Sequence, residues 1–259
     1  MKKLFTYIGI TSIFLFSFYY TEKVSSIVIN NSSLVMKINE NSSKFNILPV
    51  SAEINGDYIV PGINGTNVNV LKSYNNMKAL EVFNSYYLEY DKVLPEISLE
   101  NNKDKIIKNG NSLKNAVSVI LKDNVDLINY SKEKNIKITR LVNYDTFDKL
   151  SSNEQINDDI EKYKSVEKML NGNNLNKNIC VINKNNLDLC KENNKYLVEP
   201  THKLYNYNLA NIKSNIKSGN IIYINDDINL TDYKILIRQI YYQDLDIIPL
   251  SKLITEQRD

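Results

Sequence analysis

The stretch NAVSVILKDNVD, from Asn115 to Asp126, is the most informative one for the architecture of the second half of the chain. It predicts a short apolar strand, Val117–Leu121, that runs directly into Lys122 and Asp123. In α/β barrels the carboxyl ends of the strands share one face, and catalytic residues come from those ends. The stretch therefore raises the question of whether Asp123 takes part in chemistry.

Downstream of this strand, short apolar segments alternate with amphipathic ones as far as the C-terminus. Further strands are expected at Ile136–Val142, Ile179–Ile182, Tyr196–Val198, Ile221–Ile224 and Ile247–Ile248. One long amphipathic helix is expected to run through Ile156, Ile160, Tyr163, Val166 and Leu170. The other helices are expected at Val125–Lys134, Leu187–Lys191, Leu209–Lys217 and Leu230–Tyr242, and from Ser251 onward. This alternation predicts an α/β fold with a parallel sheet. Because the strands are fewer than a complete barrel needs, we expect a trimmed or distorted (β/α) barrel over residues 111–259.

Upstream, residues 46–110 predict a small β-rich leader module. Asn55-Gly56 separates the extended segments Val50–Ile54 and Tyr58–Val60, and Asn-Gly between such segments is a strong hairpin signal. Residues 24–45 predict a stalk with one helix, Ser32–Asn41, which begins at a serine cap.

The N-terminus, residues 1–23, predicts a signal anchor. Leu4–Tyr20 carries no charged residue, and its length is near the lower limit for a helix that crosses a bilayer. Lys2 and Lys3 precede it, which favours a cytoplasmic N-terminus and a single-pass cell-membrane protein with an extracytoplasmic C-terminal domain. A cleaved signal peptide is the alternative, although no small-x-small cleavage site follows.

Composition and cysteine usage narrow the partners and the chemistry. The chain has 259 residues and a net charge of +2, with its basic residues spread along the sequence, so nucleic acid is not expected as a partner. Cys180 and Cys190 would lie in a compartment where disulfides persist, and both a disulfide and two buried thiols remain open. A zinc site built from these two cysteines is not expected, because no partner ligands follow at suitable spacing.

Three segments of the main domain and one of the leader resemble a known family. They are VSVILKDN (Val117–Asn124), KSGNIIYINDD (Lys217–Asp227), YKILIRQIYYQDLDIIPLSKLI (Tyr233–Ile254) and YIVPGINGTNVNVLKSYNNMK (Tyr58–Lys78). The first three resemble the first strand, a late strand and the closing segment of the polysaccharide deacetylase family of carbohydrate esterases. The fourth resembles the leader of a membrane-anchored bacterial subgroup of such proteins. The resemblance implies a deacetylase-type barrel and a chain that is a degenerate, membrane-anchored member of this family.

The resemblance also implies where active-site residues should lie. Members of the family hold a divalent metal with an Asp and two His of a His-x-x-x-His loop, and they use a second Asp as base and a late His as acid. The base falls on Lys122, the metal-binding Asp on Asp123 and the late His on Asn225. The loop should follow the second strand, but Asn143–Asn157 contains no His. These positions, with Asp226, are therefore expected to be a vestigial site without a catalytic residue or a metal cofactor.

The sequence contains one histidine, His202, which is expected in a solvent-facing loop after a strand. Asp123, Asn225, Asp226 and Asp227 should lie at the same rim of the barrel. The interpretation we favour is that the aspartates cap the segments that follow them, with Lys122 available to pair with one of them; a hard-ion site for Mg²⁺ or Ca²⁺ is the alternative.

The functional hypothesis is an inactive deacetylase-like protein that binds a glycan or a protein at the cell envelope. Tyrosines expected near the groove, each offering a flat apolar face and a hydroxyl, are Tyr144, Tyr205, Tyr207 and Tyr223. Two alternatives stay open. One is an active deacetylase that uses a carboxylate metal site around Asp123 and Asp226, and the other is a structural role in docking an envelope partner.

Overall fold

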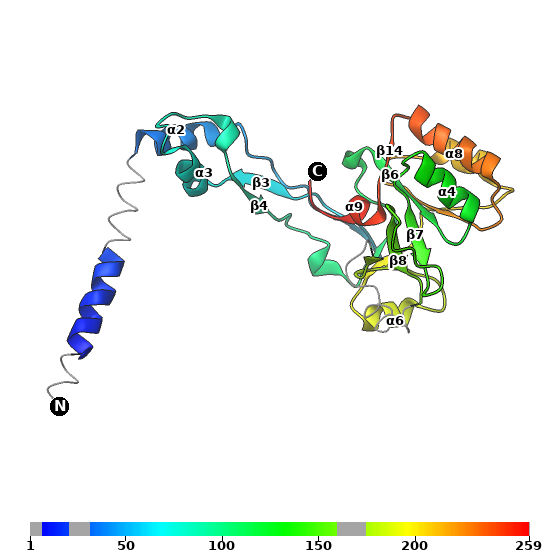
Figure 1. Cartoon of the computed structure of the whole chain (residues 1–259), viewed down its shortest axis with the longest axis horizontal. Helices are drawn as coiled ribbons and strands as arrows, with labels where there is room; N and C mark the ends of the chain where they lie inside the picture. Colours follow the sequence, from blue (N-terminus) through cyan, green and yellow to red (C-terminus); the bar gives the residue numbers. More distant parts are fainter. Residues whose placement is uncertain (1–6, 21–31, 160–174, 259) are drawn as a thin grey trace. The chain divides into compact units, whose positions relative to one another are not determined.

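The computed structural model describes residues 7–20, 32–159 and 175–258 (Figure 1). The chain forms two compact units, one comprising Met1–Leu48 with Gly65–Val93 and the other comprising Pro49–Asn64 with Leu94–Asp259. The expected leader module, residues 46–110, is thus divided between the two units. The reason is that the strand at 106–107 pairs with a strand of the main domain, and the hairpin within 53–60 pairs in turn with the strand at 106–107.

The first unit contains two helices and a two-stranded ladder. Its elements are α2 (Ser33–Ser42), β3 (Gly65–Val68), α3 (Val70–Met77), the 3-10 turn η1 (Ser85–Tyr87) and β4 (Tyr90–Val93). Strands β3 and β4 are antiparallel. The Ser32 hydroxyl accepts a hydrogen bond from the Leu34 amide at 3.3 Å, which confirms the expected serine cap. Helices α2 and α3 share a small apolar cluster that contains Ile38 and Met77.

Residues 7–20, also assigned to this unit, are helical, and their apolar side chains are exposed (dark blue in Figure 1). Within the described ranges, no helix is long and apolar enough to span a bilayer. The expected transmembrane helix is therefore not supported there. Residues 4–6, with which the expected segment begins, lie outside the described residues.

The second unit contains two sheets. The smaller sheet has the order β1-β2-β5-β11-β10. Its strands are β1 (Glu53–Asn55), β2 (Tyr58–Val60), β5 (Ile106–Ile107), β10 (Ile179–Val181) and β11 (Tyr196–Val198). Strands β1 and β2 form the expected hairpin, and Gly56 has a positive φ of 60° in its turn. The other strand pairs of this sheet are parallel.

The larger sheet is parallel throughout its described ladders. Its order is β12-β13-β6-β7-β8-β9, and β14 pairs with the start of β6. The strands are β6 (Ala116–Leu121), β7 (Thr139–Val142), β8 (Glu154–Asn157), β9 (Leu175–Asn176), β12 (His202–Leu204), β13 (Ile221–Ile224) and β14 (Asp246–Ile247). The strand expected at Val117–Leu121 is therefore central, with partners on both edges.

Helices cover the outer face of this sheet. They include α4 (Val125–Glu133), α7 (Leu209–Asn215) and α8 (Leu230–Tyr242), while α6 (Leu187–Glu192) packs on β11 and α9 (Leu250–Ile254) on β6. The described 3-10 turns of the unit are η2 (Glu100–Asn102) and η3 (Ser112–Lys114). Figure 1 shows α4 and α8 side by side, and both contribute to one cluster that includes Val119 of β6 and Tyr233 of α8.

Side-chain alternation along β6 separates two cores. Val117, Val119 and Leu121 pack against the outer helices, whereas Ala116 and Ile120 belong to an inner cluster. That inner cluster also contains residues of the smaller sheet and of α9, namely Ile59, Ile107, Ile179, Val198, Leu250 and Leu253. The two sheets therefore enclose one apolar interior, as the expected distorted α/β barrel requires.

Two expected elements are wrong. Ile156 lies in strand β8 rather than at the start of a long helix; the rest of that helix, residues 160–174, lies outside the described residues. The polar residues of β8 hid its strand character. Gln155 is buried, and its side chain can be accommodated there because it forms hydrogen bonds with both the backbone amide and the backbone carbonyl of Asp148. The other error concerns His202, which begins β12 and is half-buried rather than lying in a solvent-facing loop.

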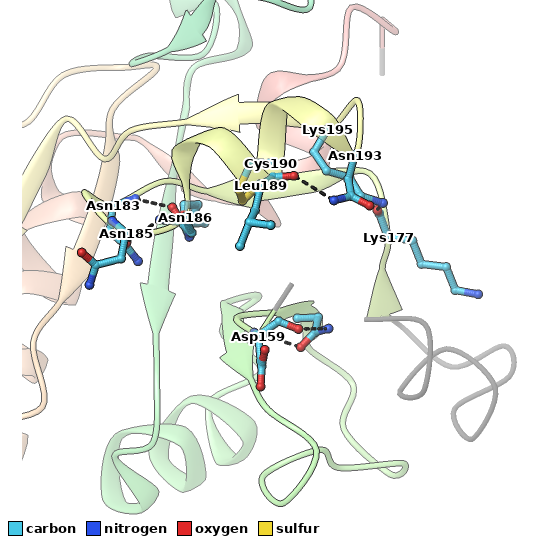
Figure 2. The surroundings of a disulfide bond; sticks show 12 residues. Asp159, Lys177, Asn183, Asn185, Asn186, Leu189, Cys190, Asn193 and Lys195 are labelled. Atoms are coloured by element: carbon cyan, nitrogen blue, oxygen red, sulfur yellow. Dashed lines mark hydrogen bonds between the residues drawn. A yellow bond between two sulfur atoms is a disulfide. The ribbon is translucent and has the colours of Figure 1, made fainter. Parts of the chain in front are cut away.

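Cys180 of β10 and Cys190 of α6 form a disulfide, so the structure selects the first of the two alternatives (Figure 2). Their Cα atoms are 6.1 Å apart, and both residues are buried beside Leu197. The turn between them is built from asparagines. Asn183 and Asn186 each accept a backbone hydrogen bond from the other, at 2.7 and 3.2 Å. Figure 2 shows these side chains between β10 and α6.

Candidate functional site

A cavity of about 200 Å³ opens at the carboxyl ends of the barrel strands. Its lining comprises Lys122, Leu141, Asp158, Val181, Ile182, Asn183, Pro200, Lys203, Tyr205 and Tyr223. Most of these residues are in phase with inward-facing neighbours of the same strand. Lys122, for example, follows Ile120 by two residues, and Asp158 follows Ile156 in the same way. The sheet geometry therefore places Lys122 in the mouth of the barrel.

Lys122 forms an ion pair with Asp158 across this mouth. The Lys122 Nζ and Asp158 Oδ2 atoms are 3.0 Å apart, and both side chains are partly exposed. The hydrogen bond and the negative charge of Asp158 raise the pKa of the Lys122 ammonium, so it is fully protonated at neutral pH. Asp158 was not among the carboxylates expected to pair with Lys122, namely Asp123, Asp226 and Asp227.

Tyrosines form another wall of the cavity. Tyr223 of β13 and Tyr205, which follows β12, both line it, and Tyr207 stacks on Tyr205 with ring centroids 5.4 Å apart and planes inclined by 5°. Burial raises the pKa of Tyr223, so its hydroxyl stays protonated and can donate a hydrogen bond at neutral pH. Tyr144, the fourth expected tyrosine, is about half exposed and lies outside the lining.

Asp123 is exposed and does not line the cavity. It also does not cap α4, because Asn124 holds that role: its side-chain oxygen accepts a hydrogen bond from the Leu127 amide at 3.3 Å. The Asn124 side-chain nitrogen donates to the Ile228 carbonyl at 3.1 Å. The expectation that Asp123 is the cap is therefore wrong by one position, since the backbone turns outward only at Asn124.

The late acidic pair also has a different role from the one expected. The helix after β13 is capped by Asn229, whose side chain accepts from the Asp232 amide, so neither Asp226 nor Asp227 is the cap. The Asn225 side-chain amide donates to Asp227 Oδ1 at 2.8 Å. In the part of the chain that the structure describes, no three His, Cys, Asp or Glu side chains come together to hold an ion, which does not support the hard-ion alternative.

A zinc-type metal centre does not fit the donors at this mouth. His202, the one histidine of the sequence, shares the face of Leu204 in β12, and that face packs into the outer cluster rather than the cavity. The inward position that the resemblance gives to a carboxylate base carries the Lys122 ammonium instead. A cation beside the metal position repels the ion, and a second imidazole ligand does not exist in the sequence.

The loop after β7 is the place where the family resemblance puts the His-x-x-x-His segment that this sequence lacks. Hydrogen bonds and ion pairs of other residues stabilise it. Asn143 Oδ1 accepts hydrogen bonds from the amides of Asp145 and Thr146, each at 3.0 Å. Asp148 pairs with Lys132 of α4 and with Arg140 of β7. The Arg140 side chain is buried beside Asp148. Its burial lowers the pKa of the guanidinium, because a charged group is disfavoured away from water.

Sequence reasoning missed several residues of the cavity, chiefly Asp158, Lys203 and Asn183. Asp158 had a usable signal, because it follows a short strand in the same way that Lys122 follows β6. That strand was assigned to a helix, and the signal was lost with it. Lys203 lies in a strand of three residues, His202–Leu204, which is too short to show alternation.

No family model and no curated protein matches the sequence. Solved structures do match the fold. BA3943 from Bacillus anthracis, described as a CE4 family pseudoenzyme, aligns with a TM-score of 0.58 and 19% identity over 87% of this chain and 96% of that chain. A BA3943 mutant described as having restored enzymatic activity aligns with a TM-score of 0.57 and 18% identity over 87% of this chain and 99% of that chain. The expected resemblance is confirmed at the level of the fold: the chain has the parallel-stranded α/β fold of these CE4 family pseudoenzymes.

Proposed function

We propose that this chain is a catalytically inactive member of the polysaccharide deacetylase family that binds a glycan at the mouth of its barrel. The observation that carries the proposal is Lys122, which occupies the inward position at the end of β6 and is paired with Asp158. Lys122 stands where the resemblance gives the family its catalytic base.

The chemistry of amide hydrolysis explains why this exchange removes activity. A metal-dependent deacetylase needs a metal to polarise the carbonyl and a base to take a proton from water. Lys122 cannot serve as that base, because Asp158 keeps its amine protonated. A covalent route lacks an activated nucleophile as well, since Cys180 and Cys190 are joined and the one histidine faces away from the cavity.

Glycan binding is supported by the composition of the cavity wall. Tyr205, on which the ring of Tyr207 is stacked, offers a flat apolar face, and the half-buried Tyr223 offers a hydroxyl. Asn183 and the Lys122–Asp158 pair add hydrogen-bond donors and acceptors. A flat aromatic face beside a set of polar groups suits a sugar ring, which has an apolar face and polar edges.

Binding of a neutral chitooligosaccharide to the full-length protein in detergent tests this function. Isothermal titration calorimetry is expected to show saturable binding that Tyr205→Ala weakens at least ~5-fold, because stacking on an aromatic face contributes about 1–3 kcal/mol. Tyr144→Ala is the matched control, since Tyr144 lies outside the cavity lining. Absence of binding to any glycan, or equal loss in both variants, would reject the role of the barrel mouth.

Membrane anchoring through residues 1–23 belongs to the same proposal. It is supported by the uncharged run Leu4–Tyr20 after Lys2 and Lys3, and by the exposed apolar side chains of residues 7–20. The full chain, expressed in a bacterium, is expected to sediment with membranes and to resist extraction at alkaline pH. A version that begins at residue 24 should leave the membrane fraction, and its retention there would refute the anchor.

A further inference from the structure

The charges that line the cavity do not balance. Its lining contains two ammonium groups, Lys122 and Lys203, and one carboxylate, Asp158. Asp158 is paired with Lys122. Lys203, in contrast, has no carboxylate within ion-pair distance among the residues that the structure describes. Asp226 acts on the Tyr223 hydroxyl from nearby, but it is not part of the lining. The cavity therefore presents one uncompensated positive charge.

Lys203 is also placed next to the aromatic wall. It pairs with Tyr223 in the ladder between β12 and β13, and Tyr205 follows it by two residues on the same side of the chain. Lys203, Tyr205 and Tyr223 thus form one continuous wall, with the Lys122–Asp158 pair completing the mouth of the barrel. A sugar ring bound against Tyr205 would therefore lie in a cavity whose lining includes Lys203.

We propose that the cavity selects a sugar unit that carries an oxyanion, a carboxylate or a phosphate, and that Lys203 is the residue that determines this selectivity. The inference rests on the proposed function, because it names the class of glycan that the same mouth takes. A neutral sugar would offer the Lys203 ammonium no counter-charge. A cationic sugar would be repelled by Lys203 and would have to compete with Lys122 for Asp158.

Lys203 is exposed, which limits the size of the effect. An exposed ion pair contributes little to affinity, and a hydrogen bond to a charged group that is shielded from water contributes more. Ligand binding covers the ammonium only in part. We therefore expect a preference of ~3- to 10-fold for the acidic sugar at low ionic strength, and a smaller preference at high salt because exposed charges are screened.

The test compares two oligosaccharides of equal length on the full-length protein in detergent. A hyaluronan oligosaccharide carries the carboxylate of glucuronic acid on alternate units, and a chitooligosaccharide is neutral. Lys203→Gln is expected to weaken hyaluronan binding ~3- to 10-fold and to leave chitooligosaccharide binding within ~2-fold. Lys217→Gln is the matched control, because Lys217 is exposed and does not line the cavity.

Competition distinguishes the two sources of the oxyanion. Glucuronic acid, glucose 6-phosphate and glucose are titrated against bound hyaluronan oligosaccharide, and the stronger acidic competitor identifies the carboxylate or the phosphate. The inference is overturned if neither acid competes better than glucose, or if Lys203→Gln and Lys217→Gln behave alike. When the neutral oligosaccharide still binds in such a case, the proposed function survives without the inference. When no oligosaccharide binds, both fail.

Discussion

The Lys122 ammonium and the Asp158 carboxylate, 3.0 Å apart, join the end of β6 to the end of β8. Strand β7 lies between these two strands in the sheet, so the pair reaches past one strand at the barrel mouth. Lys122 occupies the inward position at which the family resemblance places a base. If the proposed function is correct, a salt bridge that cannot accept a proton stands where the resemblance places a carboxylate base.

The pair should give stability a dependence on alkaline pH. The folded-state pKa of Lys122 is raised above its usual value by Asp158, so its contribution is complete below the unfolded pKa of about 10.4 and is lost as pH rises through the folded value. Both side chains are partly exposed, which limits the contribution to about 0.2–1 kcal/mol. Asp158→Asn should lower the free energy of unfolding by this amount at pH ~8 and by less at pH ~11.5.

Denaturant unfolding of the wild type and the variant at both pH values measures this difference. Lys217→Gln serves as a control for removal of an unpaired surface charge. A variant that loses more stability at the higher pH than at the lower one would show that the sign of the linkage is wrong.

Asn124, rather than its neighbour Asp123, should be important for stability. The Asn124 side chain caps α4 and bonds the Ile228 carbonyl, which ties the β6–α4 turn to the β13–α8 turn. We expect Asn124→Ala to cost about 1–2 kcal/mol of unfolding free energy. Asp123→Ala should change it by less than about 0.5 kcal/mol, because the side chain is exposed and caps nothing. Equal effects in chemical denaturation would contradict this assignment.

A buried hydroxyl pair holds α4 against α8. The Tyr233 hydroxyl lies 2.8 Å from Ser131 Oγ, which itself donates to the Leu127 carbonyl, so Tyr233 is the donor of the pair. Ser131→Ala leaves that buried donor without an acceptor and should cost about 1–3 kcal/mol. Tyr233→Phe should cost less, and the double variant should be more stable than the sum of the two single losses predicts. Strict additivity in thermal or denaturant unfolding would exclude the interaction.

The disulfide should contribute measurably to stability. Cys180 and Cys190 close a small loop, for which the chain-entropy relation gives about 2.5–3 kcal/mol. We expect the free energy of unfolding, measured by denaturant titration, to be lower by this amount in the presence of a reductant, and the midpoint to move to a lower denaturant concentration. The double variant Cys180→Ala with Cys190→Ala is the control, since it should show the same loss and no response to the reductant. A wild type that is insensitive to complete reduction would contradict the expectation.

Strands and helices with a long apolar pattern were predictable from the sequence. β6 and β13 were located within a residue of their ends, and α8 was located at both ends, because apolar periodicity and Asn or Asp caps mark these elements. β8 and β12 were not, because they are short and mix polar with apolar residues. Glu154, for instance, is accommodated in β8 because the Thr139 hydroxyl, the Asn176 side-chain amide and the Ser251 backbone amide donate to its carboxylate.

The candidate site was half predictable for the same reason. Lys122 and Tyr223 were placed at the barrel mouth because β6 and β13 were recognised, whereas Tyr205 was named as a groove tyrosine although β12, which precedes it, was not recognised. Asp158 depends on a strand that the periodicity concealed. The partner of a charged residue is a tertiary property, because β6 and β8 are neighbours only once β7 is placed between them.

Lys122 at the base position and the single histidine should prevent this barrel mouth from assembling the family's metal centre. The most direct test is metal analysis of the purified full-length protein after incubation with Zn²⁺, together with acetate release from an N-acetylglucosamine oligomer. It is to be made on the wild type and on Lys122→Asp, which restores a carboxylate at the base position. We predict no stoichiometric metal and no acetate above background for either protein, because one histidine cannot supply two imidazole ligands and an acid. Stoichiometric Zn²⁺ with sustained acetate release from the wild type would contradict the account.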